Sequence, residues 1–187
     1  MFSINNNGWL EGAHHLDSPN HDERPPDAEP SLLVIHNISL PPGAYGGPWI
    51  DDLFCNRLDA TAHPYFAEIS TLRVSSHLLI RRDGQVCQYV SLDKRAWHAG
   101  DSCFDGRSSC NDFSIGVELE GCDDSLYEPE QYQALVEVTR NIRSRYPAIT
   151  TECIVGHSDI APRRKTDPGE AFDWTYFRAM LKEPLIN

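Results

Sequence analysis

The chain has 187 residues, of which 40% are hydrophobic and 10% aromatic, enough for one domain whose buried core needs no disulfides. Its 28 acidic and 16 basic side chains leave a net charge of −12, which argues against a nucleic-acid-binding protein because phosphate partners favour a basic face. No stretch is long enough to cross a membrane, and residues 1–12 lack the basic and apolar regions of a signal peptide, so we expect a cytoplasmic protein.

The first part of the chain predicts a surface arm followed by a buried strand. Residues 13–30 are polar and rich in proline, so we interpret residues 1–30 as an irregular arm outside a folded core over residues 31–181. SLLVIH (31–36) is a continuous apolar run, which is typical of a strand buried on both faces. This strand would deliver His36 and Asn37 to its end. A short helix with one apolar face is expected after Pro48, and Pro64 rules out an uninterrupted helix over residues 58–70.

Two further β segments follow. Residues 76–90 contain two β-rich runs around Asp83 and Gly84, and they predict a hairpin whose turn uses positive φ angles. After residue 100 we expect a polar, glycine-containing loop to Asn111. FSIGVELEG (113–121) then predicts a central strand in which Glu118 and Glu120 share one face. A carboxylate buried there would be salt-bridged or functional, because burying an unpaired charge is costly, whereas two exposed carboxylates would mark an edge strand.

Two helices complete the pattern. Residues 128–147 place apolar side chains at helical spacing between two prolines, and Asp173 is expected to cap a last helix with one apolar stripe. Strands that alternate with helices, together with one hairpin, predict an α/β fold. We therefore expect a single domain over residues 1–187, with a central mixed β-sheet flanked by helices.

The densest group of polar residues is GHSDIAPRRKTDPG (156–169). The β-branched run ECIV (152–155) predicts a strand before it, so His157 would lie where that strand runs into a loop. Lys165 and Asp167 are two residues apart and would point the same way in an extended segment. Taken alone, the segment is better explained as a solvated loop, because two candidate ligands do not make a zinc site.

Further candidate ligands come from the other strands. His36, Glu118 and His157 would all lie on the strands, or at the strand ends, of one sheet, where catalytic groups commonly gather. Two imidazoles and one carboxylate fill three positions of a catalytic zinc site, and zinc lowers the pKa of water toward ~7. Glu118 could then accept a proton while Lys165 stabilises a developing oxyanion, and such a site would hydrolyse an amide. Spacing alone names no class of enzyme.

The six cysteines lack C-x-x-C spacing and are expected to be reduced, mostly as core residues.

Five blocks in chain order carry a resemblance. They span nearly the whole chain and are VIHNISLPPG (34–43), HLLIRRDG (77–84), KRAWHAG (94–100), CNDFSIGVELEG (110–121) and residues 156–169. They resemble the cytoplasmic 1,6-anhydro-N-acetylmuramyl-L-alanine amidases of the zinc-dependent N-acetylmuramoyl-L-alanine amidase type 2 family, which is related to peptidoglycan recognition proteins.

The resemblance implies a zinc enzyme of cell-wall recycling. It implies one Zn²⁺ per chain with His36, His157 and Asp167 as ligands, and Glu118 and Lys165 as catalytic residues. The reaction would cut the bond between the lactyl group of anhydro-muramic acid and L-alanine, which also removes muropeptides that induce β-lactamase in bacteria that have the pathway. The partner would be this small-molecule substrate, with no nucleic acid, no membrane and no obligate protein partner.

The resemblance also implies substrate contacts, with one departure from the family pattern. Ser109 stands where relatives commonly have an arginine, and Arg107 remains. The missing arginine is the one expected near the carboxylates of the stem peptide, so we expect Arg73, which matches another family arginine, to make that contact alone. Arg107 is retained as a substrate-binding candidate, and Asn37 and Trp97 are expected near the sugar or peptide.

Three alternatives stay open. One is a module of the same fold that has lost its zinc and binds peptidoglycan fragments without cutting them, although none of the ligand positions is replaced here. The second is an exported amidase that attacks the intact wall, and the third is a zinc hydrolase with another substrate.

Overall fold

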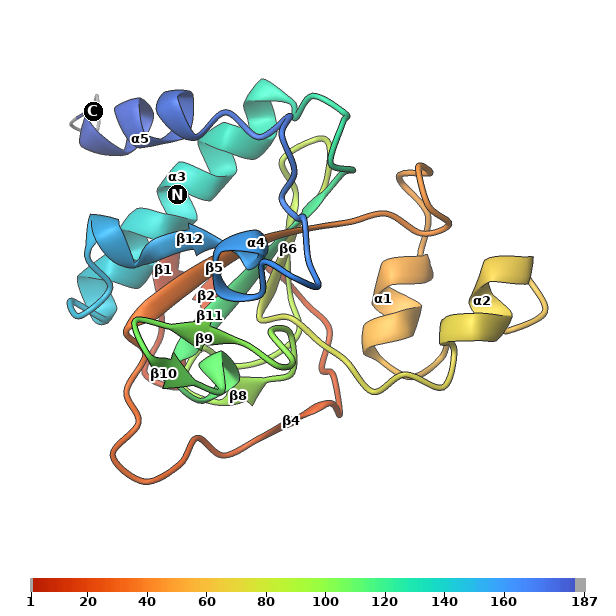
Figure 1. Cartoon of the computed structure of the whole chain (residues 1–187), viewed down its shortest axis with the longest axis horizontal. Coiled ribbons are helices and arrows are strands. Elements are labelled where there is room, and N and C mark those ends of the chain that lie inside the picture. Colours follow the sequence, from red (N-terminus) through yellow and green to blue (C-terminus); the bar gives the residue numbers. More distant parts are fainter. Residues whose placement is uncertain (1, 184–187) are drawn as a thin grey trace.

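Two seven-residue strands rich in apolar residues form the centre of a six-stranded sheet in the computed structural model, which describes residues 2–183 (Figure 1). All of β11 (Ser114–Glu120) is buried, as are the first five residues of β5 (Leu32–Ile38), because helices cover both faces. The strand order is β12-β5-β11-β6-β7-β3. The other four strands are β12 (Ile154–Gly156), β6 (Leu78–Ile80), β7 (Val86–Gln88) and β3 (His14–His15). Of the predicted domain, residue 1 and residues 184–187 lie outside the described residues.

The directions of the strands confirm the predicted mixed sheet. β12, β5, β11 and β6 run parallel to one another, whereas β7 is antiparallel to β6. The predicted hairpin joins β6 to β7, but only Gly84 in its turn has a positive φ, of 82°. Parallel strands place their carboxyl ends at one edge of the sheet, which is where ligands bind in open α/β sheets.

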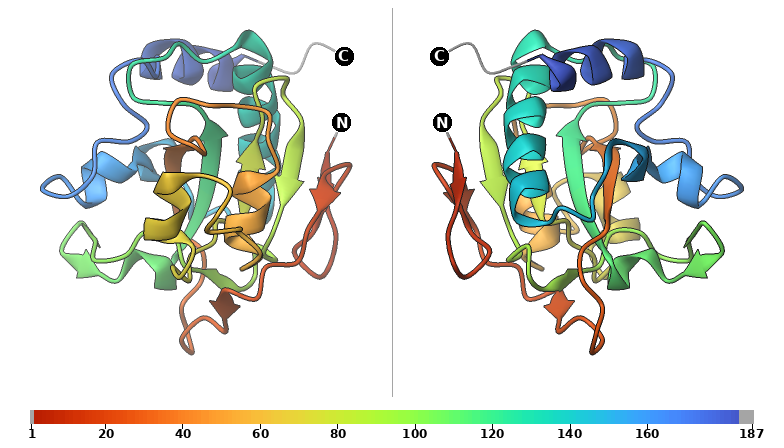
Figure 2. Two further views of the ribbon diagram at one scale, coloured as in Figure 1. Left: turned by 90° about the vertical axis from the view of Figure 1, so that its right-hand side faces the viewer. Right: turned by 90° about the vertical axis from the view of Figure 1, so that its left-hand side faces the viewer.

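Helices cover both faces of this sheet, as the two opposite views of Figure 2 show. The long helix α3 (Pro129–Arg145) lies on one face with α5 (Trp174–Lys182) packed against it, while α1 (Trp49–Phe54) and α2 (Pro64–Ile69) lie on the other. The predicted caps are present: Asp173 accepts a hydrogen bond from the Tyr176 backbone N–H at 2.8 Å. α2 begins at Pro64, where the missing N–H costs nothing.

The N-terminal arm is more ordered than the prediction of an irregular segment. β1 (Ser3–Ile4) pairs with β2 (Leu10–Glu11), β3 extends the edge of the main sheet beside β7, and β4 (His21–Asp22) pairs with β8 (Arg95–Ala96). Arg24 donates to the backbone carbonyls of residues 92, 111, 112 and 114. Composition did not indicate this because backbone pairing to a sheet edge depends on the fold and not on local apolar periodicity.

Three further expectations need correction. The predicted strand 152–155 starts late, because a 3₁₀ turn occupies Thr151–Cys153 and His157 opens the short helix α4 (His157–Ile160). The predicted loop to Asn111 contains the hairpin β9 (Cys103–Phe104) with β10 (Arg107–Ser108) and a 3₁₀ turn at Cys110–Asp112. All six cysteines are free, but only Cys87 and Cys110 are buried, so most are not core residues.

Over residues 2–183, every helix falls short of the length and apolar character that crossing a membrane demands.

Candidate functional site

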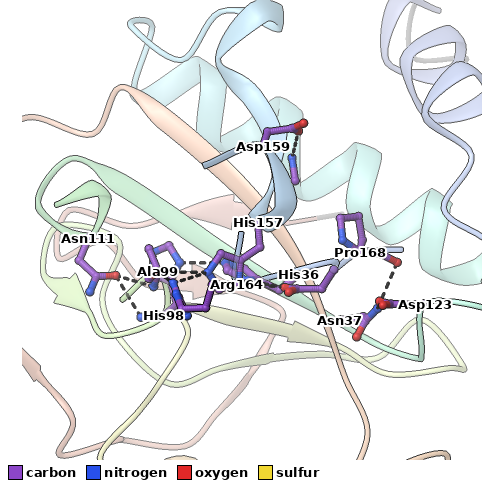
Figure 3. A network of polar contacts seen from close by, with 12 residues as sticks. His36, Asn37, His98, Ala99, Asn111, Asp123, His157, Asp159, Arg164 and Pro168 are labelled. Carbon is purple, nitrogen blue, oxygen red and sulfur yellow. Dashed lines mark hydrogen bonds and ion pairs between the residues drawn. The ribbon is translucent and has the colours of Figure 1, made fainter. Parts of the chain in front are cut away.

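The register of the sheet brings the candidate residues together. In the parallel pairing of β11 with β5, Glu118 lies directly opposite His36. β12 pairs on the other side of β5, where Gly156 lies opposite Ile35, so His157 follows beside His36. Figure 3 shows the two histidines adjacent, although they are 121 residues apart in the sequence.

Three possible ligand atoms converge at this edge. His36 Nδ1 lies 2.9 Å from His157 Nδ1, and Asp167 Oδ2 lies 3.0 Å from each of these nitrogens. His36 and His157 are only 1% and 2% exposed. A tetrahedral zinc ion with bonds of about 2.0–2.1 Å separates its ligand atoms by roughly 3.3 Å, so an outward shift of a few tenths of an ångström would admit one. The donor set and its spacing fit zinc.

The pKa shifts of His36 and Asp167 also suit a metal ion, which needs a neutral imidazole and an ionised carboxylate. Burial lowers the pKa of His36 to about 4, against the opposing effect of Asp167. Burial raises the pKa of Asp167, but hydrogen bonds with His157 and His36 outweigh it and hold that pKa below its usual range.

The structure separates the two aspartates of the 156–169 segment. Asp159 Oδ2 accepts a hydrogen bond from the Gly156 N–H at 2.7 Å, and Figure 3 shows it turned away from the histidines. Asp167 lies against both imidazoles, and its backbone carbonyl accepts from the Ser158 N–H at 2.9 Å. The loop is also held by the Tyr127 hydroxyl, which donates to Pro168 O at 2.7 Å. Asp167 is therefore the aspartate placed for a ligand.

Glu118 and Lys165 line the same pocket as the three ligand candidates. Glu118 is 9% exposed, and within residues 2–183 its Oε2 has no hydrogen-bond partner. Burial raises the pKa of Glu118 well above its usual value, and the Asp167 charge raises it further while Lys165 opposes the shift. A perturbed carboxyl beside a metal-ligand cluster is typical of a proton-transfer group.

The pocket has a volume of about 380 Å³, and both polar and apolar side chains line it. The polar ones include the residues described above. The apolar ones come from the loop after β5, from α1 and α2 and from the segment before β6, and they include Leu40, Pro42, Leu53, Tyr65, Ile69 and Leu72. A larger hollow of about 540 Å³ lies between the N-terminal arm and the end of α3, but its lining does not include the His36, His157 and Asp167 cluster.

Known proteins resemble this chain in sequence and in fold. The family model for N-acetylmuramoyl-L-alanine amidase matches residues 26–170. The chain is 63% identical to the 1,6-anhydro-N-acetylmuramyl-L-alanine amidase AmpD of Enterobacter cloacae over 175 residues, which is 94% of this chain and 93% of that one. A crystal structure of a selenomethionine AmpD derivative matches with a TM-score of 0.92 at 59% identity, covering 95% of this chain and 99% of that one. The chain belongs to the N-acetylmuramoyl-L-alanine amidase family.

A more distant member of the amidase family has been solved with a ligand. The E. coli amidase AmiD, in complex with the substrate anhydro-N-acetylmuramic acid-L-Ala-D-γ-Glu-L-Lys, matches with a TM-score of 0.60 at 29% identity. The match covers 95% of this chain and 65% of that one.

The four residues of this chain that the sequence predicts as substrate contacts divide into two that line the pocket and two that do not. Asn37 and Trp97 line the pocket: the Asn37 amide donates to Asp123 Oδ1 at 2.7 Å, and the Trp97 indole N–H donates to Asp22 Oδ1 at 3.1 Å. Arg73 and Arg107 are not in its lining. Arg73 is exposed and donates to the carbonyls of residues 71 and 72, and the Arg107 guanidinium lies 3.7 Å from the centre of the Phe113 ring. Ser109 has a left-handed φ of 61°.

Sequence reasoning missed a second layer of contacts in this amidase. His98 Nδ1 lies 2.9 Å from His36 Nε2, and the Ala99 carbonyl oxygen lies 3.1 Å from His157 Nε2. Arg164 also donates to that carbonyl, at 2.6 Å. Asn111 Oδ1 accepts the backbone N–H groups of His98 and Ala99 at 3.1 and 2.7 Å (Figure 3). The KRAWHAG block contains two of these residues, but spacing gives no sign of what they contact.

Proposed function

We propose that this chain is a zinc-dependent amidase that cuts the bond between the lactyl group of 1,6-anhydro-N-acetylmuramic acid and L-alanine in soluble muropeptides. The observation that carries the proposal is the convergence of His36, His157 and Asp167 in the lining of a pocket that Glu118 also lines. The identity to AmpD over nearly the whole chain supports the substrate, as does the ligand named for AmiD. We place the reaction in cytoplasmic cell-wall recycling, where it would also lower β-lactamase-inducing muropeptides.

The proposed chemistry divides between a metal and two side chains. His36, His157 and Asp167 would hold one zinc ion, which supplies a Lewis acid and lowers the pKa of water to about 7. Glu118 accepts the proton of the attacking water and passes it to the leaving amine of L-alanine. The Lys165 ammonium stabilises the negative charge that develops on the carbonyl oxygen.

Substrate contacts are proposed for four further residues. Asn37 and Trp97 lie in the pocket lining and are assigned to the sugar or the first peptide residues. Arg73 is flanked by two lining residues, Leu72 and Val74, so it is assigned to a carboxylate of the stem peptide at the rim. Arg107 is assigned to the far end of a longer peptide, since it lies outside the pocket lining.

Cleavage of a defined substrate tests the proposal. The full chain is incubated with 1,6-anhydro-N-acetylmuramyl-L-Ala-D-γ-Glu-L-Lys, and the products are followed by mass spectrometry. We expect free anhydro-muramic acid and the free tripeptide, with one zinc per chain by elemental analysis. Chelation should abolish the activity and zinc should restore it. A metal-free chain with full activity would refute the zinc enzyme, and binding without cleavage would favour the non-catalytic module.

The physical state of the substrate gives a second test. A chain that meets only fragments inside the cell should act poorly on intact sacculi. Comparable rates per bond on sacculi and on the anhydro-muropeptide would overturn the proposed restriction to soluble fragments.

A further inference from the structure

His98 is a partly buried histidine in the pocket lining, and it contacts the candidate ligand His36 (Figure 3). Its Nδ1 is 2.9 Å from His36 Nε2, and its Nε2 is 3.1 Å from Ser114 Oγ on the central strand. The two imidazole rings meet edge to face, with centroids 5.0 Å apart and an interplanar angle of 86°. Both ring nitrogens of His98 therefore have a polar partner, and one partner is the outward nitrogen of His36.

The positions of the protons in this chain of contacts follow from metal binding. His36 can coordinate a metal through Nδ1 only if that nitrogen has its lone pair available, so the proton must be on Nε2. The Nε2–H group then donates to His98 Nδ1, which must act as an acceptor. His98 in turn carries its own proton on Nε2 and donates it to Ser114 Oγ.

The central strand makes room for the His98 ring. A Cβ atom at Gly116, in the middle of β11, would lie 2.5 Å from His98 Cγ and 2.6 Å from its Nδ1. Glycine inside a central strand weakens that strand, and its presence marks the close approach of another group. Here the approaching group is His98, and a side chain at position 116 would occupy the space that its ring fills.

The backbone around His98 is fixed as well. Asn111 Oδ1 accepts the N–H groups of both His98 and Ala99, and the Ala99 carbonyl accepts from His157 Nε2–H at 3.1 Å. One short segment thus contacts the outward nitrogens of both histidines. The side chain of His98 contacts His36, and the backbone carbonyl of Ala99 contacts His157.

We propose that His98 is a positioning residue that fixes the tautomer and ring orientation of His36, so that Nδ1 is presented to the metal. The proposal rests on the zinc site proposed above. Outer partners of metal-bound histidines typically contribute 10–100-fold to metal affinity. His77 is a neighbouring comparison: its ring centroid lies 5.7 Å from that of His98, but it is fully buried and its contacts are the Gly116 N–H, the Lys94 carbonyl and Arg24.

Zinc affinity of the full chain tests the proposal, measured by competition with a chromophoric chelator after circular dichroism has shown each variant to be folded. His98→Phe keeps the ring but removes the acceptor, and we expect its zinc dissociation constant to rise about 10–100-fold. His98→Asn restores an acceptor near the position of Nδ1 and should recover most of that loss. His77→Gln should bind zinc like the wild type. Wild-type affinity in His98→Phe, or equal losses in the His98→Phe and His77→Gln variants, would overturn the proposal.

A measurement on the unaltered protein removes any dependence on the folding of a variant. Long-range ¹H–¹⁵N correlation spectra of the zinc-loaded chain, labelled at histidine, report which ring nitrogens carry protons. We expect a proton on Nε2 of both His36 and His98, and a proton on His98 Nδ1 would refute the proposal. A wild-type chain that binds no zinc would refute the metal site itself, and with it the role of His98.

Discussion

Glu118 and Glu120 are two residues apart on the same buried strand, yet their surroundings are opposite. Glu120 accepts hydrogen bonds from the Gly46 N–H at 2.8 Å and from Arg81 and the Arg82 N–H at 3.2 Å each. Glu118 Oε2 has no partner within residues 2–183, and its pKa is raised by burial. Glu120 is thus paired with an arginine and two backbone N–H groups, whereas Glu118 has an oxygen that can still accept a hydrogen bond.

The difference shows how a structural charge can be told from a catalytic one. The pair of Glu120 and Arg81 holds the loop at Gly46 and Gly47 against the end of the sheet, since Arg81 also donates to Gly47 O at 3.1 Å. A carboxylate that is fully engaged in this way has no capacity to accept a proton from a substrate. Glu118 retains that capacity beside His36, His157 and Asp167, as the proposed proton acceptor requires.

The largest expected effect is on turnover in Glu118→Gln. Loss of the proton acceptor should lower the single-turnover rate on anhydro-muropeptide by about 10²–10⁴-fold. Zinc content by elemental analysis should stay at the wild-type level, because Glu118 is not a proposed ligand. If this variant keeps a near wild-type rate, Glu118 is not the proton acceptor and the functional distinction between the two carboxylates fails.

Lys165→Ala should have the next largest effect. Removal of a group that stabilises the oxyanion typically costs about 10²–10³-fold in rate. Arg163→Ala is the matched control, because Arg163 is an exposed cation two residues away and is absent from the lining of the pocket that holds Lys165. Equal rates for the two variants, or loss of zinc in Lys165→Ala, would contradict the assigned role.

Glu120→Gln should affect stability and not chemistry. The substitution weakens the hydrogen bonds that Glu120 accepts from the Gly46 and Arg82 N–H groups and leaves Asp51, at 2.7 Å, as the remaining carboxylate paired with Arg81. We therefore expect the free energy of unfolding to fall by about 1–3 kcal/mol. Denaturant unfolding of the chain measures this loss. Glu118→Gln is the internal comparison, and it should unfold at the wild-type denaturant concentration or above, because it removes a buried charge that has an unpartnered oxygen. Similar losses in both variants would end the distinction between the two carboxylates.

The smallest effect on stability is expected at Asp159, which is also paired. Asp159→Ala removes the acceptor of the Gly156 N–H at the start of α4 and should cost about 1 kcal/mol. Its zinc content should be unchanged, whereas Asp167→Asn should lose zinc. A fall in zinc content confined to an Asp159 variant would show that the ligand has been wrongly assigned.

Much of the fold was predictable because its central elements carry local signals. The apolar run of β5, the prolines and apolar spacing of α3 and the Asp173 cap indicate their structures without tertiary information. The arm, the late start of β12 and the β9–β10 hairpin were missed, because short strands form where a partner is available and composition does not reveal the partner.

The candidate site likewise contains residues that the local sequence indicated and contacts that only the folded chain creates. His36 and His157 could be selected because each lies on or directly after an apolar run, and family resemblance supplied Asp167. Spacing could not show that Glu118 and Glu120 differ, because Arg81 approaches only one of them through the fold. It also could not show His98 behind His36, since a contact over 62 residues depends on the arrangement of the whole sheet.

The order in which the site is built along the chain has a consequence for synthesis on the ribosome. His36 and Asp167 are 131 residues apart, and β12, which carries the chain to His157, is the last strand of the sheet to be made. Because chains emerge from the N-terminus, β5, β6 and β11 can pair before β12 exists. The nascent chain can thus bring His36 and Glu118 together early, while the proposed ligand set of His36, His157 and Asp167 stays incomplete until nearly the entire polypeptide has left the exit tunnel.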